Sequence, residues 1–363
     1  MVDPLEAKLG SKARILLPIA ILTFVGLSAW RMWPRGPEVV SVKGPTMGTS
    51  FAVTVVGADL DDAAISKAVR DELDEANALM SNYIDDSEIT RFNRHRGADP
   101  FPLSGPMLEV LTISEEVAAL SEGAFDVTIP PLLEAWGFGP RGDADRPPPS
   151  EAELAERRLL VDHKLLRLDA AASTATKGRP ELEIDLSAIA PGYAADRIAA
   201  ALEALGYRRY MVDVGGEFRV LGTNAEGVPW RLGIERPAAT RADAPTLQEV
   251  LPMTSGALAT SGDYRSYREL DGRRVSHTID PRTGRPIEHA LASVSVVHRD
   301  AAHADALATA LNVLGPVDGL ALAERASLAV MMIVRAGDGF EVVTTPAFDA
   351  LRAPEARAKL GGT

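Results

Sequence analysis

Hydroxyl, carboxylate and imidazole side chains gather in one short stretch, between Ala259 and Pro286. The polar residues of its two ends are Ser261 and Asp263, then Ser276, His277, Thr278 and Asp280. A hairpin dipeptide, Asp271-Gly272, lies between strand-like segments, so we expect the two ends to meet in space. An imidazole with a pKa of about 6.5 can accept a hydroxyl proton at neutral pH. The alternative is a polar hairpin whose histidine is satisfied by hydrogen bonds.

A second pair of oxygen-bearing side chains lies further along the chain. Asp305 and Thr309 are four residues apart on a predicted helix, Ala301–Leu314, so both project from one face. A carboxylate and a hydroxyl are hard oxygen ligands that suit Mg²⁺, which keeps several waters and often binds substrate phosphate as well. The alternative is a solvent-facing aspartate beside a threonine bonded to its own helix backbone.

Two further segments could bring backbone close to a ligand. The predicted strand ending at Val214 runs into Gly215-Gly216, which lets backbone approach a ligand or makes a simple turn. The pair lacks the G-x-G-x-x-G pattern, so it does not indicate a Rossmann fold. Ile184–Tyr193 is predicted to be a strand, loop and helix start that aims backbone groups at an anion. Alternatively, Asp185 or Ser187 only caps that helix.

Composition narrows the class of protein. The 363-residue chain is 46% hydrophobic and 25% charged, which is enough to bury a full core. Its net charge of −13 and the lack of a basic run with interleaved aromatics argue against nucleic acid as a partner. The absence of cysteine excludes disulfides, thiolate metal sites and cysteine nucleophiles.

The N-terminal segment addresses location. Lys8, Lys12 and Arg14 precede the apolar run Ile15–Trp30, and Trp33 follows it. Basic residues before an apolar run and tryptophans at its end are typical of a segment held in a membrane. We expect an uncleaved signal anchor and linker over 1–37, with a body over 38–363 that faces the periplasm from the inner membrane. A cleaved signal peptide and a buried soluble helix are the alternatives.

The remaining elements form an α+β pattern without regular β-α-β alternation. Helices are predicted at Asp61–Met80, Leu108–Ser121, Gly192–Leu205 and Ala301–Leu314. Strands are predicted at Val39–Val42, Ser50–Val56, Lys164–Leu168, Glu181–Leu186, Tyr210–Val214, Glu217–Leu221, Trp230–Glu235, Ala292–Val297, Leu328–Val334 and Phe340–Thr344. The first two strands are expected to meet at a turn over Gly44-Pro45.

Taken in order, the motifs resemble those of the ApbE family, the FAD:protein FMN transferases. They are M-G-T-S-F (Met47–Phe51), M-S-N-Y-I-D-D-S-E-I-T-R-F-N (Met80–Asn93), G-A-F-D-V-T-I-P-P-L-L-E-A-W-G-F-G (Gly123–Gly139), I-D-L-S-A-I-A-P-G-Y-A-A-D (Ile184–Asp196), V-G-G-E (Val214–Glu217), S-G-D-Y (Ser261–Tyr264), S-H-T-I-D-P-R-T-G-R-P (Ser276–Pro286) and A-D-A-L-A-T-A-L (Ala304–Leu311). Each motif alone is weakly specific. Eight in the family's order, over almost the whole body, are very specific.

The resemblance implies an ApbE-like, T-fold-related body of antiparallel sheets packed with helices. It implies that FAD is cleaved with Mg²⁺ and that FMN passes to a Ser or Thr of a target flavoprotein, with release of AMP. The metal would be held by Asp305, Thr309 and the backbone carbonyl of Ala188, and His277 would be the base. The positions that match FAD-binding ones are Met47, Tyr83, Ala124, Phe125, Asp126, Asp185, Pro191, Gly215, Gly216 and Asp280.

The resemblance also implies partners and leaves two rival functions open. The acceptor would carry a Ser/Thr-Gly-Ala-Ser/Thr segment, as in a NosR-like or an Rnf- or Nqr-like subunit. Pro191 stands where many members have Lys or Glu, and the A-P-G form resembles NosX-like members. The rivals are an FAD pyrophosphatase and a non-catalytic FAD-binding maturation factor. Pyrophosphatases of the family carry Asn at the position of Tyr83, which favours transfer here.

Overall fold

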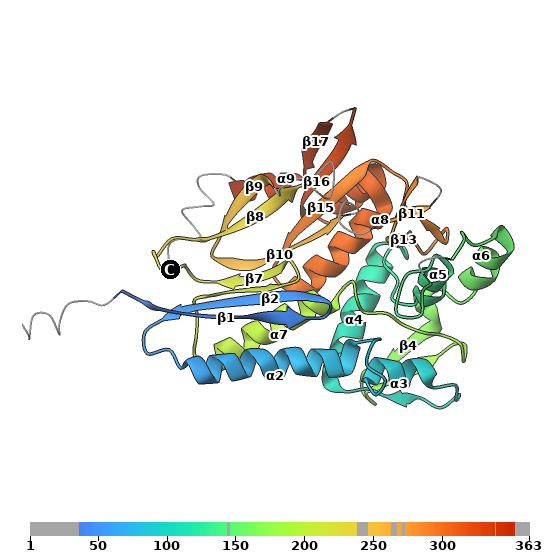
Figure 1. The fold of residues 1–363 in the computed structure, drawn as a ribbon, viewed down its shortest axis with the longest axis horizontal. Coiled ribbons are helices and arrows are strands. Elements are labelled where there is room, and N and C mark those ends of the chain that lie inside the picture. Colours follow the sequence, from blue (N-terminus) through green and yellow to red (C-terminus); the bar gives the residue numbers. More distant parts are fainter. Residues whose placement is uncertain are drawn as a thin grey trace, which may run out of the picture. The chain divides into compact units, whose positions relative to one another are not determined.

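The computed structural model describes residues 36–143, 146–237, 246–262, 267–270, 273–337 and 339–352. The predicted N-terminal anchor, Asp263 and the Asp271-Gly272 turn lie outside these residues. From Glu38 onward the chain forms one compact unit built on an eight-stranded sheet (Figure 1). In spatial order the strands are β1 (Glu38–Thr46), β2 (Thr49–Gly57), β6 (Tyr210–Val214), β7 (Glu217–Leu221), β10 (Ser255–Gly262), β15 (Leu291–His298), β16 (Ala329–Ala336) and β17 (Gly339–Thr344). All neighbours pair antiparallel, which confirms the predicted fold class.

The first hairpin corrects one prediction. The expected turn at Gly44-Pro45 is wrong, because β1 continues through both residues. Pro45 is tolerated there because β1 is an edge strand, where a missing N–H leaves no neighbouring strand unsatisfied. The turn is made instead by Met47 and Gly48, which both have positive φ, 46° and 72°. Two such residues form the tight loop that matches strand twist.

Three helices pack together on one side of the sheet: α2 (Asp62–Met80), α7 (Ala190–Ala204) and α8 (Ala301–Arg325). Figure 1 shows α2 and α7 alongside β1 and β2. Helix α2 buries one stripe, from Ile65 to Met80, and its N-cap Asp61 accepts a hydrogen bond from Ala64 N at 2.9 Å. Burial of that stripe follows from apolar residues at helical spacing.

Helix α8 carries the predicted metal ligands and has a break. Its predicted end at Leu314 is close to the observed kink, where Gly315 takes a φ of 77° and Pro316 follows. Among the described residues it is the helix that is long and apolar enough to cross a membrane, with a mean hydropathy of 1.5. It packs against β10, β15 and α7 with most of its first half buried, so it serves as a core helix.

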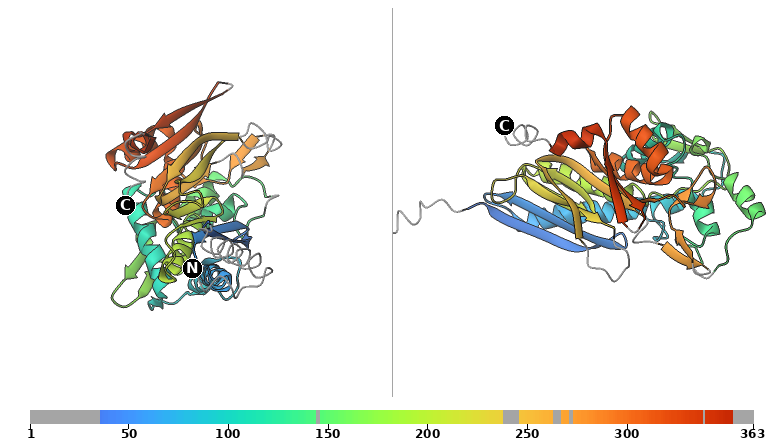
Figure 2. Two further views of the ribbon diagram at one scale, coloured as in Figure 1. Left: turned by 90° about the vertical axis from the view of Figure 1, so that its left-hand side faces the viewer. Right: turned by 90° about the horizontal axis from the view of Figure 1, so that it is seen from above.

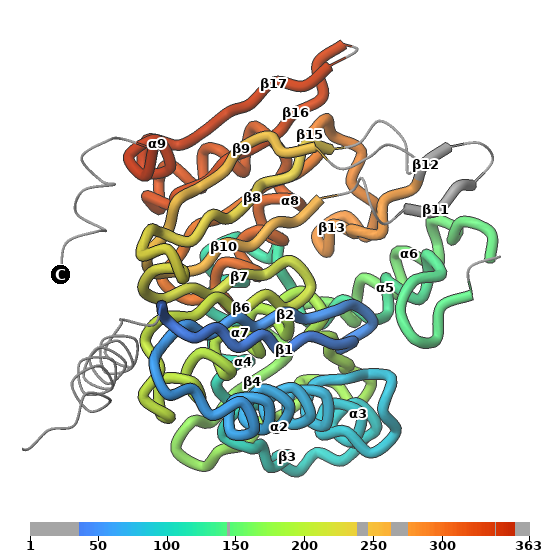
Figure 3. Tube along the Cα trace, turned by 60° about the vertical axis from the view of Figure 1, so that its left-hand side comes forward, coloured from blue at the N-terminus to red at the C-terminus, as the bar shows by residue number. Residues whose placement is uncertain are grey.

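The other side of the sheet is covered by a smaller layer. The hairpin of β8 (Trp230–Arg236) and β9 (Thr246–Met253) and the last helix α9 (Pro346–Arg352) form it. Their apolar side chains, which include Trp230 and Leu232 of β8 and Phe348 of α9, share a core with residues of β2, β7, β10 and β16. In Figure 3, β1, β2, β6 and β7 lie between the β8–β9 hairpin and the helices α2 and α3.

Helix α4 and a set of short elements form the part of the body that carries the loops. They are α3 (Glu88–Arg94), β3 (Phe101–Pro102), α4 (Gly105–Leu120), α5 (Pro130–Ala135), α6 (Glu151–Arg158), η1 (His163–Leu165), β4 (Leu166–Asp169), β5 (Thr174–Lys177), β11 (Tyr267–Leu270), β12 (Arg273–Ser276), β13 (Ile279–Asp280) and β14 (Arg285–Pro286). In the view from above in Figure 2, α6 lies at one end of the body. Strands β11 and β12 pair antiparallel, as the hairpin prediction requires. The predicted strand Glu181–Leu186 is wrong, since this segment is an irregular loop.

Candidate active site

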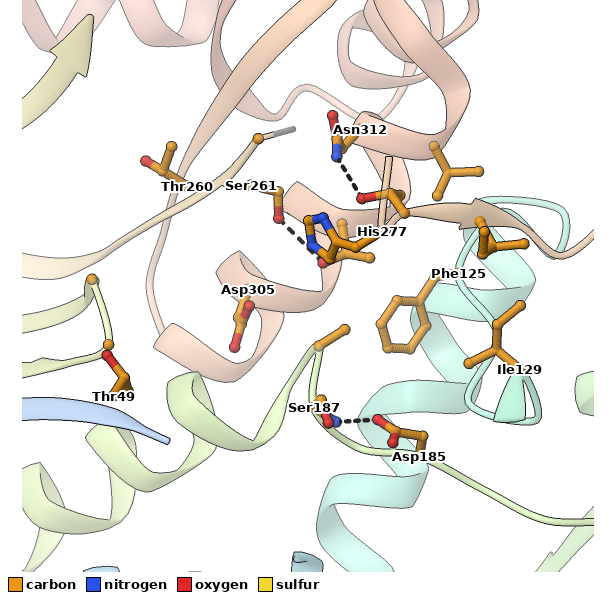
Figure 4. Close-up of a pocket in the computed structure, with 18 of the residues that line it drawn as sticks. Thr49, Phe125, Ile129, Asp185, Ser187, Thr260, Ser261, His277, Asp305 and Asn312 are labelled. Atoms are coloured by element: carbon orange, nitrogen blue, oxygen red, sulfur yellow. Dashed lines mark hydrogen bonds between the residues drawn. The ribbon is translucent and has the colours of Figure 1, made fainter. Parts of the chain in front are cut away.

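Segments from across the sequence converge on one cavity of about 680 Å³. Most of the predicted site residues line it: Ala124, Phe125, Asp126, Asp185, Ala188, Gly215, Gly216, His277, Asp305 and Thr309. They come from the β6–β7 turn, the loops before α5 and α7, the link between β12 and β13, and α8. Figure 4 shows Asp305, Asp185, Phe125 and His277 around the same space.

The predicted metal ligands lie at the α8 side of the cavity. Asp305 is 6% exposed, and its Oδ2 accepts a hydrogen bond from Gly192 N at 3.0 Å. A Cβ added at Gly192 would lie 2.3 Å from the carbonyl oxygen of Ala301, so only glycine lets α7 approach α8 this closely. Burial raises the pKa of Asp305 to about 7. Among the residues that the structure describes, no Lys or Arg forms an ion pair with it.

Thr309 lies on the same cavity wall and is hydrogen-bonded to the neighbouring strand. Its Oγ1 is 3.2 Å from Ser261 Oγ at the end of β10. Ala188 lines the same cavity and belongs to the loop that precedes α7. The structure therefore brings all three predicted metal ligands to one cavity.

His277 is half-buried in the two-residue link between β12 and β13, and its ring points into the cavity (Figure 4). The next residue is held firmly. Thr278 N donates to Ser276 Oγ at 3.1 Å, and Thr278 Oγ1 accepts from Asn312 Nδ2 at 3.3 Å. Asn312 is on α8 and only 1% exposed. The histidine is thus mounted on backbone that is tied to the helix carrying Asp305.

The two cavity loops that precede α5 and α7 are each held by hydrogen bonds to an aspartate. Asp126 Oδ1 accepts from Thr128 N at 2.8 Å, and its Oδ2 accepts from His163 N at 2.8 Å. Burial raises the pKa of Asp126, although these hydrogen bonds oppose the shift. Asp185 accepts from Ser187 N at 2.7 Å, and its own N–H donates to Val127 O at 2.7 Å. The two loops therefore support each other.

The Gly215-Gly216 turn joins β6 to β7 with φ values of 71° and 108°. Gly215 is already close to Thr49, since an added Cβ would lie 3.0 Å from Thr49 Cγ2. An added Cβ at Gly216 would meet no atom within 4 Å. Gly216 N donates to Asp213 Oδ1 at 3.0 Å, so the turn is held from below while its outer surface lines the cavity. The open space at Gly216 would let a ligand approach the backbone of the turn.

Four predicted ligand-binding residues lie outside this cavity lining. Met47 is at the tip of the β1–β2 hairpin, and Pro191 is in the first turn of α7. Tyr83 is 76% exposed and lines a neighbouring depression of about 330 Å³, which shares Asp185 and Leu133 with the main cavity. Asp280 pairs with Arg282, whose Nη2 is 2.9 Å from its Oδ2, while the adjacent Pro281 lines the cavity.

The first turn of α7 has neither a side-chain cap nor a free amide. Its N-cap is Ile189, which has no side-chain hydrogen bond, and Asp185 and Ser187 do not cap the helix. The first amides are used elsewhere: Ala190 N donates to Leu186 O, and Gly192 N donates to Asp305. Pro191 has no N–H. The first turn of α7 therefore positions Asp305 and has no amide left for an anion.

The sequence analysis did not predict several of the residues that line the cavity. Those with polar side chains include Thr49, Asp213, Glu235, Thr260 and Asn312. Thr49 lies inside the quoted M-G-T-S-F motif, and Asp213 precedes the glycine pair, so adjacency to a motif was the available signal. Asn312 had none of its own, because a polar residue on an apolar helix is as often structural as functional.

Comparison with known proteins places these features in a family. The ApbE family matches residues 47–332. The FAD:protein FMN transferase of Vibrio cholerae serotype O1 is 42% identical over 315 residues, covering 86% of this chain and 92% of the relative. The protein of the same name from Escherichia coli strain K12 is 37% identical over 349 residues, covering 95% of this chain and 99% of that one.

Solved structures agree with the sequence relatives. The Pseudomonas stutzeri flavinyl transferase ApbE superposes with a TM-score of 0.80 at 37% identity, covering 92% of this chain and 100% of that chain. The flavin transferase ApbE from Vibrio cholerae gives a TM-score of 0.78 at 40% identity, covering 86% of this chain and 99% of that chain. The resemblance seen in the motifs is confirmed over most of the chain, which belongs to the ApbE family.

Proposed function

We propose that this protein is an FAD:protein FMN transferase. The P–O bond within the FAD pyrophosphate breaks, a new P–O bond forms to a Ser or Thr hydroxyl of an acceptor flavoprotein, and AMP leaves. The observation that carries the proposal is the convergence of Asp305, Thr309, Ala188 and His277 on one cavity. The names of the relatives support the same reaction.

Mg²⁺ fits the donor set of this cavity. Asp305 is a buried carboxylate that accepts a backbone hydrogen bond, and no Lys or Arg among the described residues forms an ion pair with it. Buried charges are normally paired or bound to a metal. Asp305, the Thr309 hydroxyl and the Ala188 carbonyl would hold the ion, and all three are oxygen donors. When bound, Mg²⁺ supplies positive charge to the phosphate oxygens as their negative charge increases.

His277 would remove the proton of the acceptor hydroxyl. Its ring faces the cavity and its backbone neighbours are fixed through Thr278 to Asn312. General-base catalysis by a positioned histidine contributes about 10²–10⁴-fold to a rate. The cavity of about 680 Å³ is within the range of small-molecule sites, and Phe125 offers an apolar wall to a flavin.

The proposal includes the acceptor segment and the cellular location. The acceptor carries a Ser/Thr-Gly-Ala-Ser/Thr segment, as in NosR-like or Rnf- or Nqr-like subunits, and the body works on the periplasmic side of the inner membrane. The apolar run Ile15–Trp30 and the cations before it support this location. Fractionation of the full-length protein tests it: we expect sedimentation with membranes and protease access only from the periplasm. Recovery as a soluble cytoplasmic protein would refute it.

Covalent labelling tests the reaction. The protein is incubated with FAD, Mg²⁺ and an acceptor domain, and the flavin is followed by intact mass and in-gel fluorescence. We expect labelled acceptor and AMP from the unmodified enzyme. In His277→Ala, labelling should fall by about 10²–10⁴-fold while FAD still binds, because a missing base need not weaken ground-state binding. His95→Ala, remote from the cavity lining, serves as the matched histidine control.

The same assay separates transfer from hydrolysis. An unmodified enzyme that releases FMN and AMP but labels no acceptor would overturn the transferase proposal. Tyr83→Asn should shift the product from labelled acceptor toward free FMN, by analogy with the hydrolytic branch of the family. Tyr83 is exposed beside Asp185, so its replacement should leave the fold intact.

A further inference from the structure

A second group of ligand-type side chains lies where β15 ends and α8 begins. His298 is the last residue of β15, Asp300 is the N-cap of α8, and His303 lies in its first turn. Their ligand atoms all lie within 4.8 Å of one another. The cluster borders a second cavity, of about 710 Å³, whose lining shares no residue with that of the FAD cavity.

The two imidazoles converge on one carboxylate oxygen. His303 Nδ1 lies 2.5 Å from Asp300 Oδ1, and His298 Nδ1 lies 3.3 Å from the same oxygen. The two rings are 5.0 Å apart. In a tetrahedral zinc site with bonds of 2.0–2.1 Å, ligand atoms are separated by about 3.4 Å. Small side-chain rotations would therefore open a site for an ion between the three groups.

We propose that His298, Asp300 and His303 bind Zn²⁺. Two imidazoles and one carboxylate, with water completing the coordination, are a ligand set that zinc takes in proteins. Mg²⁺ prefers an all-oxygen shell, so it should not compete for the histidines. The side chains are 18–26% exposed, so an ion can reach them from solvent while the flanking strand and helix hold them.

Glu116 supplies an independent indication. Its Oε2, from α4, lies 3.2 Å from Nε2 of His303, the ring nitrogen that faces away from Asp300. Metal-bound histidines usually donate their second N–H to a carboxylate, which fixes the tautomer that leaves the other nitrogen free for the metal. Besides the two histidines, the cation that pairs with Asp300 among the described residues is Arg299, whose side chain is 84% exposed.

Zinc here would join the end of β15 to the start of α8. That helix also carries Asp305, so the ion would brace the element that presents the proposed Mg²⁺ ligands. The role is structural, and it stands independently of flavin transfer. An ion that binds only the folded chain stabilises it by mass action, so zinc should raise the melting temperature.

The test is zinc content after equilibrium dialysis of the full-length protein in excess Mg²⁺. We expect one zinc per chain in the unmodified protein. Affinity should fall by about 10–100-fold in Glu116→Gln, because that side chain orients a ligand without binding the ion. His298→Ala and His303→Ala should lose more. His95→Ala and Asp305→Ala should keep the zinc, which separates this site from other histidines and from the proposed Mg²⁺ site.

Two results would overturn the proposal. One is an unmodified protein that retains no zinc. The other is full zinc binding by the His298→Ala/His303→Ala double variant. If a variant fails to fold by circular dichroism, the absorption spectrum of Co²⁺ bound to the unmodified protein decides instead. A Co²⁺ spectrum that is typical of nitrogen ligands, that disappears when zinc displaces the Co²⁺ and that is weaker in Glu116→Gln supports the site. A spectrum of hydrated Co²⁺ alone rejects it.

Discussion

Asp300 and Asp305 lie five residues apart on one helix, yet their surroundings are opposite. Asp300 accepts a hydrogen bond from His303 N as the N-cap and contacts two imidazoles and an exposed arginine. Asp305 is nearly inaccessible and accepts one backbone N–H, from Gly192. Burial raises the pKa of Asp305 to about 7. Burial acts on Asp300 as well, but hydrogen bonds and charge from His298 and His303 hold its pKa well below the usual range.

The two surroundings determine how each negative charge is compensated. Asp300 is surrounded by the two imidazoles that, by our proposal, share Zn²⁺ with it, and as the N-cap it also stabilises the start of α8. No Lys or Arg among the described residues forms an ion pair with Asp305, and a bound cation would compensate its charged form. The same residue type is thus a helix cap in one turn and, by our proposal, a Mg²⁺ ligand in the next.

The largest expected effect comes from Asp305→Ala. Removing one partner of a buried charge pair costs about 3–5 kcal/mol, which is roughly a 200- to 5,000-fold change in an equilibrium constant. The Mg²⁺ concentration for half-maximal FMN transfer should rise by that factor. It is measured by titrating Mg²⁺ in the labelling assay.

Asp318→Ala is a matched control for Asp305→Ala. Asp318→Ala removes a carboxylate from the same helix but beyond the Gly315 kink and away from the cavity lining, so the Mg²⁺ requirement should be unchanged. Full transfer by Asp305→Ala at low Mg²⁺ would contradict the assignment of Asp305 as a metal ligand.

The stability of the metal-free protein should depend on pH through Asp305. Its folded-state pKa, about 7, is above the ordinary 3.8, so between these values the folded state binds more protons than the unfolded one. Stability therefore falls as pH rises through this window. Asp305→Asn removes the charge, so its melting temperature in EDTA should exceed that of the unmodified protein at pH 8, and the gap should close toward pH 4. A gap that widens at low pH would be inconsistent with this account.

Sequence patterns predicted most of the regular elements, because their signals are local. The stripe of apolar residues in α2 and the alternation in β6 and β7 gave bounds that agree within a residue or two. The turn at Gly44-Pro45 failed because the tolerance of proline depends on β1 being at the sheet edge, which is a tertiary property. The Glu181–Leu186 segment alternates acidic residues with the buried Leu182, Ile184 and Leu186, and local pattern cannot distinguish such a buried loop from a strand.

The site was predicted less from spacing than from family motifs. Spacing alone placed Asp305 with Thr309 and suggested that Ser261 meets His277, and both pairs line the cavity. The role of Gly192 could not be foreseen, since it depends on contact between α7 and α8, over 100 residues apart in the chain. His298, Asp300 and His303 were also missed, although they lie within six residues of one another, because no sequence pattern showed that their ring nitrogens and carboxylate oxygen meet.

Thr309→Val should have a smaller effect than the loss of Asp305. A neutral hydroxyl contributes no net charge, and a typical hydrogen bond contributes about 0.5–1.5 kcal/mol, so we expect a change of about 2–13-fold in the Mg²⁺ requirement. The same titration measures it. An effect as large as that of Asp305→Ala would indicate that Thr309 does more than supply one neutral oxygen.

The smallest expected effect belongs to Ser261→Ala, and it decides how the Thr309 hydroxyl is used. Ser261 Oγ lies 3.2 Å from Thr309 Oγ1, so it orients that hydroxyl without being a proposed metal ligand. Loss of the contact should raise the Mg²⁺ requirement by less than about fivefold, near 1 kcal/mol. In a double-mutant cycle, Ser261→Ala should add almost nothing to Thr309→Val, because the hydroxyl that it orients is already gone. Additive effects of the two substitutions would mean that Ser261 acts elsewhere in the cavity, and that Thr309 is oriented without it.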